Sequence, residues 1–175
     1  MSGQYELAEI MIDEKQILNR AAEIADEISS DFAGESVLMV GILKGAVLWL
    51  SDIVKKIKTD VQIDFMSVSS YGASTKSTGI VKIVKDLDIP IDGKNVIIVE
   101  DIVDSGVTLN YLKHYLLGMG PKCLKICTLL DKPAGRRVDI EADYVGFTVE
   151  DRFIVGYGLD YDQRHRNLPY ITCID

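Results

Sequence analysis

Apolar residues return along the chain at two spacings, one typical of helices and one of strands. Between residues 13 and 32 they recur every three or four positions, which gives one apolar stripe along a helix. The members of that stripe are Ile17, Leu18, Ala21, Ile24, Ala25 and Ile28. Asp13 is suited to cap its first turn. Unbroken apolar runs at 36–42 and 96–99 predict strands that are buried on both faces of a sheet.

The rest of the chain continues this alternation of helices and strands. We expect helices over about 46–57 and 109–119, and strands over 61–69, 80–86, 122–130 and 143–147. Residues 70–79 are rich in small and hydroxyl side chains, so we interpret them as a mobile loop, although a plain hairpin connection would look similar. The alternation predicts an α/β fold with a mostly parallel twisted sheet, whose ligands bind beyond the carboxyl ends of the strands.

Size and charge narrow the function classes. The 175 residues are enough for one domain with a sizeable core, so we expect residues 1–175 to form a single domain. A net charge of −8 gives no basic surface for nucleic acid or acidic membranes. Lys44 interrupts the most apolar stretch, which is too short to span a bilayer. Without an export signal, and with three cysteines in no disulfide or metal pattern, we expect a cytoplasmic protein.

Residues 96–108 carry the most informative chemistry of the chain. The apolar strand is followed by Glu100 and Asp101, and then by a turn, residues 104–108, that leads into a helix. Such a turn presents free backbone N–H groups to an anion, and its two hydroxyl side chains add donors. Gly106 allows backbone conformations and close approaches that a Cβ would block. The segment therefore predicts a phosphate site.

Other chemically active residues follow predicted strands in the same way. These are Lys44 and Lys132, which join Glu100, Asp101 and Asp104 of the segment just described. Because the carboxyl ends of parallel strands meet at one edge of a sheet, we expect these side chains to converge there.

The strand, the acid pair and the turn together resemble the thirteen-residue motif with which type I phosphoribosyltransferases bind phosphoribosyl diphosphate (PRPP). The Leu43-Lys44-Gly45 turn and the segment 151–161 are similar to the pyrophosphate loop and the purine segment of the hypoxanthine-guanine enzymes of that family. The resemblance covers about residues 36 to 170 in the same order. Ser105 replaces the commoner Thr and keeps its hydroxyl. Val107 stands where some relatives have Lys, but the backbone carries the phosphate contact there.

The resemblance implies an enzyme of purine salvage that transfers the phosphoribosyl group of PRPP to hypoxanthine or guanine, giving IMP or GMP and pyrophosphate. It implies Mg²⁺ as the cofactor and PRPP and an oxopurine base as small-molecule partners, without nucleic acid or membrane. A preference for xanthine or adenine is an alternative, and so is a regulator that keeps the fold and binds nucleic acid. We expect a homodimer or homotetramer, because oligomers are usual for the family.

The resemblance also assigns a role to individual residues. Asp104 is the catalytic residue, as general base at purine N7. The residues for the 5′-phosphate and ribose are Glu100, Asp101, Asp104, Ser105, Gly106, Val107 and Thr108. Those for pyrophosphate are Lys44, Gly45 and Arg166, and those for the purine are Lys132, Phe153, Ile154 and Asp160. Glu100, Asp101 and Asp160 hold the metal. Ser70 and Tyr71 stand at the start of a loop that closes over the site as a lid. The N-terminal segment and about 148–175 form a hood. Arg136 and Arg137 receive no role.

Overall fold

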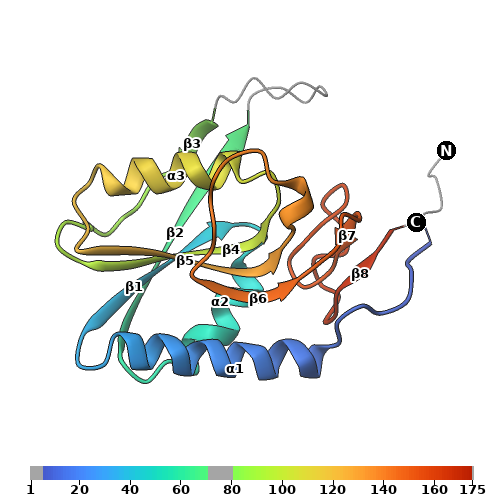
Figure 1. The fold of residues 1–175 in the computed structure, drawn as a ribbon, viewed down its shortest axis with the longest axis horizontal. Helices are drawn as coiled ribbons and strands as arrows, with labels where there is room; N and C mark the ends of the chain where they lie inside the picture. The colour runs from blue at the N-terminus through green and yellow to red at the C-terminus, as the bar shows by residue number, and fades with distance from the viewer. Residues whose placement is uncertain (1–5, 71–80, 175) are drawn as a thin grey trace.

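The computed structural model describes residues 6–70 and 81–174, and its centre is a six-stranded sheet in the order β3-β2-β1-β4-β5-β6 (Figure 1). The strands are β1 (Ser36–Leu43), β2 (Asp60–Ser70), β3 (Val81–Lys85), β4 (Asn95–Val103), β5 (Cys123–Asp131) and β6 (Tyr144–Thr148). All neighbouring pairs are parallel except β2 with β3, which is antiparallel. The predicted α/β fold with a mostly parallel sheet is therefore confirmed.

Three helices cover the two faces of the sheet. They are α1 (Glu14–Asp31), α2 (Val47–Val54) and α3 (Val107–Leu117). The first two lie against one face and α3 lies against the other (Figure 1). Asp13 caps α1 as predicted, because its carboxylate accepts the N–H of Gln16 at 2.8 Å while the Gln16 side chain accepts the N–H of Asp13 at 2.9 Å. Within the described chain, no helix is both long and apolar enough to cross a membrane.

The two central strands are buried on both faces, as their unbroken apolar runs predict. Val37 to Ile42 in β1 and Val96 to Val99 in β4 are all buried. Trp49 of α2 is fully buried on the face shared with α1, and Leu112 of α3 is fully buried on the other face. Since both faces of the sheet are occupied, functional side chains must lie at its edges or ends.

The structure corrects two predicted boundaries beside the phosphate turn. β4 extends four residues past the apolar run, so Glu100 and Asp101 lie inside the strand rather than after it. The reason is that β5 continues alongside, pairing Thr128 with Glu100 and Asp131 with Val103. Helix α3 begins at residue 107 rather than 109, so the turn is tighter than predicted.

The two ends of the described chain pair with each other. The short strands β7 (Ile154–Val155) and β8 (Thr172–Cys173) form an antiparallel sheet, and single bridges join Leu7 to Ile174 and Ile12 to Ile171. The buried hydroxyl of Thr172 donates to the carbonyl oxygens of Ala8 and Glu9 at 2.9 and 3.0 Å. This pairing places the C-terminal segment, which includes the predicted purine-binding residues, beside the main sheet (Figure 1).

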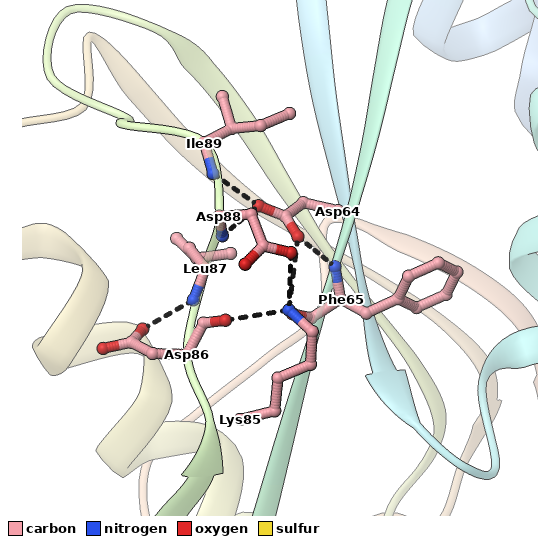
Figure 2. Close-up of polar contacts among 7 residues, drawn as sticks. All are labelled: Asp64, Phe65, Lys85, Asp86, Leu87, Asp88 and Ile89. Carbon is pink, nitrogen blue, oxygen red and sulfur yellow. Dashed lines mark hydrogen bonds and ion pairs between the residues drawn. The ribbon is translucent and has the colours of Figure 1, made fainter.

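A buried carboxylate fastens the connection from β3 to β4 onto β2. Asp64, 5% exposed, accepts the N–H groups of Asp88 and Ile89 at 2.8 and 2.9 Å and that of Phe65 at 2.7 Å. The Lys85 ammonium lies 3.7 Å from the same carboxylate (Figure 2). A buried charge with this many donors is fully satisfied, so Asp64 anchors this connection to β2.

Candidate functional site

The predicted phosphate turn joins β4 to α3 and shapes a small pocket. Gly106 has φ of +78°, the left-handed conformation that favours glycine, and it stands directly before the first turn of α3. The pocket, about 140 Å³, is lined by Glu100, Ile102, Val103, Asp104, Ser105, Gly106, Thr108 and Leu109. Free N–H groups and the positive end of the helix dipole at this terminus favour an anion.

The acid pair of the motif lies beside this turn in an environment that opposes ionisation. Burial, and then the neighbouring charge of Asp101, raise the pKa of Glu100 well above its ordinary value. Burial also raises the pKa of Asp101, although the N–H of Ile102, which donates to its Oδ1 at 2.7 Å, opposes that rise. Two carboxyl groups in this state gain from any ligand that brings hydroxyl donors or positive charge.

Asp104 and Lys132 meet although they follow different strands. The Lys132 ammonium lies 2.9 Å from Asp104 Oδ2 and 3.1 Å from Asp151 Oδ1. Burial lowers the pKa of Lys132, but the hydrogen bonds that its ammonium donates to the two carboxylates outweigh this effect, so the net pKa is raised. The lysine therefore stays charged as a hydrogen-bond donor next to a carboxylate that can accept a proton. Asp151 was not predicted as its partner.

Two of the predicted pyrophosphate residues, Lys44 and Arg166, converge on Gln163, which the sequence did not single out. Its Oε1 accepts from Lys44 Nζ at 3.0 Å and from Arg166 Nη2 at 3.3 Å, and its N–H donates to Asp160 at 2.8 Å. Arg166 also pairs with Asp160 Oδ1 at 2.9 Å and donates to the Gly158 carbonyl at 2.6 Å. Two cations separated by more than a hundred residues are thus held close together.

Close backbone contacts at two glycines bring this cation pair to the acid pair. A Cβ on Gly45 would lie 1.8 Å from Asp101 Oδ2, so the Asp101 carboxylate rests directly on the Gly45 backbone. A Cβ on Gly158, where φ is +103°, would lie 2.0 Å from the Gly45 carbonyl oxygen. The turn after β1, the end of β4 and the C-terminal segment therefore touch at one place, and the Leu43–Lys44 peptide bond within that turn is cis.

Phe153 and Ile154 lie at the start of the C-terminal segment. The Phe153 side chain is 54% exposed, and its ring contacts Tyr161 edge to face with centroids 5.5 Å apart. An exposed ring of this kind has a free face for a flat base. Ile154 is buried and pairs with Cys173 between β7 and β8, which fixes its backbone beside Phe153.

The predicted metal residues do not form a cage made of protein alone. Among the described residues no group of three or more His, Cys, Asp or Glu is arranged to hold a metal ion. Asp101 and Asp160 are nevertheless close enough that the charge of Asp160 raises the pKa of Asp101, while Arg166 lowers it. Mg²⁺ commonly uses one or two carboxylates together with substrate phosphates, so these two carboxylates fit it with a ligand present.

Of the two predicted lid residues, the structure describes only one. Ser70 is the last residue of β2, and Tyr71 lies outside the described residues. The residues that sequence reasoning missed, Gln163 and Asp151, are common polar types in loops. Only their contacts with Lys44, Arg166 and Lys132 distinguish them, and no sequence pattern predicts those contacts.

Comparison with known proteins agrees with this geometry. The family model of the phosphoribosyl transferase domain matches residues 10–162. The hypoxanthine-guanine phosphoribosyltransferase of Bacillus subtilis (strain 168) is 49% identical over 168 residues, 96% of this chain and 93% of that protein. The enzyme of the same name from Mycobacterium tuberculosis (strain CDC 1551 / Oshkosh) is 45% identical over 176 residues, 97% of this chain and 87% of that protein.

Solved structures give the same result. A hypoxanthine-guanine phosphoribosyltransferase from Bacillus anthracis superposes with a TM-score of 0.93 at 49% identity, covering 97% of this chain and 100% of that one. A hypoxanthine phosphoribosyltransferase from Staphylococcus aureus gives a TM-score of 0.94 at 46% identity, covering 97% and 92%. With the fold, the phosphate turn and these matches in agreement, the chain belongs to the phosphoribosyltransferase family, among the hypoxanthine-guanine phosphoribosyltransferases.

Proposed function

We propose that this protein transfers the phosphoribosyl group of PRPP to hypoxanthine or guanine, forming IMP or GMP and releasing pyrophosphate, as its relatives are named for doing. One observation carries the proposal: Asp104 and Lys132 meet at 2.9 Å directly beside the phosphate turn. A proton acceptor and a proton donor held side by side can address the two polar atoms of an oxopurine, N7 and the 6-oxo group.

The substrate PRPP fits the site from the turn to the cation pair. Its 5′-phosphate would accept from the N–H groups and hydroxyls of residues 104–108, where the pocket lies. Its ribose hydroxyls would lie against Glu100 and Asp101, whose raised pKa values suit hydrogen bonding with hydroxyl groups. Its pyrophosphate would then reach the turn after β1, at Lys44 and Gly45, and Arg166.

The chemistry needs charge stabilisation more than it needs a strong base. When the bond from C1 to pyrophosphate breaks, positive charge builds on the ribose and negative charge on the leaving group. Gln163 holds Lys44 and Arg166 together, so both cations would lie near that negative charge as it develops. The ribose cation would develop beside the carboxyl groups of β4.

We assign base selection to residues directly after β5 and at the start of β7. Lys132 would donate to the 6-oxo group, which adenine lacks, so an oxopurine is favoured. The exposed ring of Phe153 would stack on the base, and the Ile154 backbone would read its edge. Asp104 would take the proton of N7 as the base forms its bond to the ribose.

We also propose Mg²⁺ as the cofactor. Asp160 and Asp101 would hold it together with the phosphate oxygens, and Glu100 would help to position it. When bound, Mg²⁺ would neutralise part of the charge that develops on pyrophosphate. Asp160 would have to loosen its ion pair with Arg166, which is then free to contact the same leaving group.

The partners follow from the same site. PRPP and an oxopurine are small molecules, and a chain with a net charge of −8 lacks the basic surface that nucleic acid requires. From the family we extend the proposal to a homodimer or homotetramer in the cytoplasm. Light scattering coupled to size-exclusion chromatography would measure the subunit number directly.

A spectrophotometric assay of nucleotide formation tests the function. The protein is mixed with PRPP, Mg²⁺ and, in separate reactions, hypoxanthine, guanine, xanthine or adenine. We expect turnover with hypoxanthine and guanine and none above background with adenine. Turnover of adenine alone would contradict the role of Lys132, and no turnover with any base would contradict the proposed activity.

A further inference from the structure

Residues 133–140, to which the proposed function gives no role, pack directly on the phosphate turn. Three of their side chains would meet a Cβ placed on Gly106: Ile140 at 2.5 Å, Val138 at 3.2 Å and Arg136 at 3.3 Å. The backbone N–H of Arg137 also donates to the carbonyl oxygen of Ser105 at 2.9 Å. Because this segment presses on the turn without a gap, its position sets the position of the phosphate donors.

Arg136 connects that segment to the strand that carries the base lysine. One nitrogen of its guanidinium pairs with the carboxylate of Asp131, the last residue of β5 and the direct neighbour of Lys132. The two paired side chains are only 18% and 21% exposed. The other terminal nitrogen, Nη1, is buried and has no hydrogen-bond partner among the described residues. The stem of Arg136 thus contacts Gly106, while its charged end contacts the end of β5.

An ion pair in this setting acts as a rigid link. If one partner is removed, the other is left as a charge with little access to water, which is costly. A guanidinium also holds a carboxylate in a fixed orientation, which the rounder ammonium of lysine does less well. The next residue, Arg137, offers a contrast because its side chain is exposed, while its backbone N–H donates to the turn.

We propose that Arg136 is a positioning residue that fixes the phosphate turn relative to Lys132, through its ion pair with Asp131 and its contact with Gly106. It does not itself touch the substrate. The inference rests on the proposed function, because that function assigns PRPP to the turn and the base to Lys132. Its effect should therefore appear in substrate affinity rather than in the chemical step.

Steady-state kinetics of Arg136→Met, Arg136→Lys, Asp131→Asn and the control Arg137→Met test the proposal. Methionine keeps most of the apolar stem and removes the charge, so Arg136→Met should raise KM for PRPP about 10-fold, a cost consistent with slight misplacement of a binding group. KM should change more than kcat. Asp131→Asn should act in the same direction, Arg136→Lys should restore part of the affinity, and Arg137→Met should leave both constants unchanged.

The double variant Arg136→Met with Asp131→Asn gives a sharper result. Since neither charge then remains unpaired, it should lose less than the sum of the two single variants. Equal KM for PRPP in Arg136→Met and Arg137→Met would overturn the proposal, and so would a lowered Tm of Arg136→Met with KM unchanged. If Arg136→Met failed to fold, Arg136→Lys and Asp131→Asn would carry the same comparison.

The proposal and the proposed function can fail separately. Wild-type protein that formed no nucleotide would contradict the function. In that case the rise in Tm on adding PRPP with Mg²⁺ still tests the positioning role, because it must be smaller for Arg136→Met than for Arg137→Met. An equal rise in Tm for these two variants would overturn the positioning role.

Discussion

At the scale of single residues, the site joins groups whose ordinary behaviour has been altered by burial and by neighbours. Glu100 and Asp101 are carboxyl groups with raised pKa values, and Lys132 is an ammonium whose charge is secured by two carboxylates. Altered proton affinity of this kind is typical of binding and catalytic groups. It also makes each residue testable by a substitution that changes charge but hardly changes shape.

Replacing Asp104 should affect the chemical step. Asp104→Asn keeps the shape and removes the proton acceptor, so we expect kcat to fall by about 10²-fold or more, the range for loss of a general base. The affinity for PRPP should change far less. Rapid-mixing kinetics would give kcat, and isothermal titration with PRPP and Mg²⁺ would give the affinity. Unchanged turnover would remove Asp104 from this role.

Replacing Lys132 should affect base recognition. Lys132→Met keeps the length of the side chain and removes the donor to the 6-oxo group. The loss of one charged hydrogen bond should lower kcat/KM for hypoxanthine by about 10- to 100-fold, with a smaller change in the affinity for PRPP. Equal losses for both substrates would argue against a direct contact with the base.

Replacing Glu100 should stabilise the substrate-free protein. Burial and Asp101 raise the pKa of Glu100 well above its ordinary value of 4.5. Between the pKa of the unfolded chain and that of the folded protein, the folded protein therefore holds a proton that the unfolded chain has released. The free energy of unfolding therefore falls as pH rises through the folded pKa. Glu100→Gln should remove this fall. Each kcal/mol recovered should raise Tm by about 2–4 °C near neutral pH.

Melting curves from pH 5 to 8 measure that change. Wild-type protein should lose more stability with rising pH than Glu100→Gln does, and the variant should be less active because a ribose contact is altered. Identical pH dependence for the two proteins would show that Glu100 does not carry the effect.

At the scale of elements, the sequence predicted the order of helices and strands and most of their ends, but not the end of β4 or the start of α3. The stripe of α1 and the buried runs of β1 and β4 were predictable because local spacing decides burial there. The extension of β4 to residue 103 was not, because it depends on pairing with β5, far away in sequence. The strands β7 and β8 have two residues each and carry no periodic signal.

The candidate site divides in the same way. Residues 100–108 were predictable because one continuous motif carries them. The partners Gln163 and Asp151 were not, because they act across the fold, through Lys44, Arg166 and Lys132. Long-range pairing therefore limits what sequence reasoning can reach, both for the strands and for the site.

The anchor at Asp64 should be important for the stability of the outer strands (Figure 2). Asp64→Asn replaces one acceptor oxygen by an amide that cannot accept the N–H groups of its neighbours, so at least one buried donor loses its partner. We expect a loss of about 2 kcal/mol, which corresponds to a Tm lowered by roughly 4–8 °C. Calorimetry measures the change, and faster hydrogen exchange at Asp88 and Ile89 would locate it.

Asp88→Asn is the matched control for this anchor. Its side chain is 80% exposed and pairs with the same Lys85 at 3.0 Å, so the loss of that surface pair should be nearly neutral. If Asp64→Asn and Asp88→Asn had the same Tm, the buried hydrogen bonds of Asp64 would not be what stabilises this region.

At the scale of the whole molecule, the site is built from parts distant in the chain: the turn after β1, the end of β4, the end of β5 and the C-terminal segment. The turn after β1, the end of β4 and the C-terminal segment meet where Gly45 contacts both Asp101 and Gly158. The end of β5 joins them through Lys132, which pairs with Asp104 and Asp151. A ligand that spans from the phosphate turn to Arg166 therefore holds together the sheet and the paired terminal segments. Such a ligand should stabilise the entire fold rather than one loop.

PRPP with Mg²⁺ should accordingly raise Tm. At about 100 times its dissociation constant, a ligand that binds only the folded state adds about 2.7 kcal/mol, which for this size corresponds to roughly 5–10 °C. Arg166→Met should reduce the rise, because the pyrophosphate end loses a cation. Arg164→Met removes the same charge from an exposed side chain two residues away and should leave the rise unchanged. Equal rises for both variants would mean that the pyrophosphate does not reach Arg166, and that the C-terminal segment takes no part in holding PRPP.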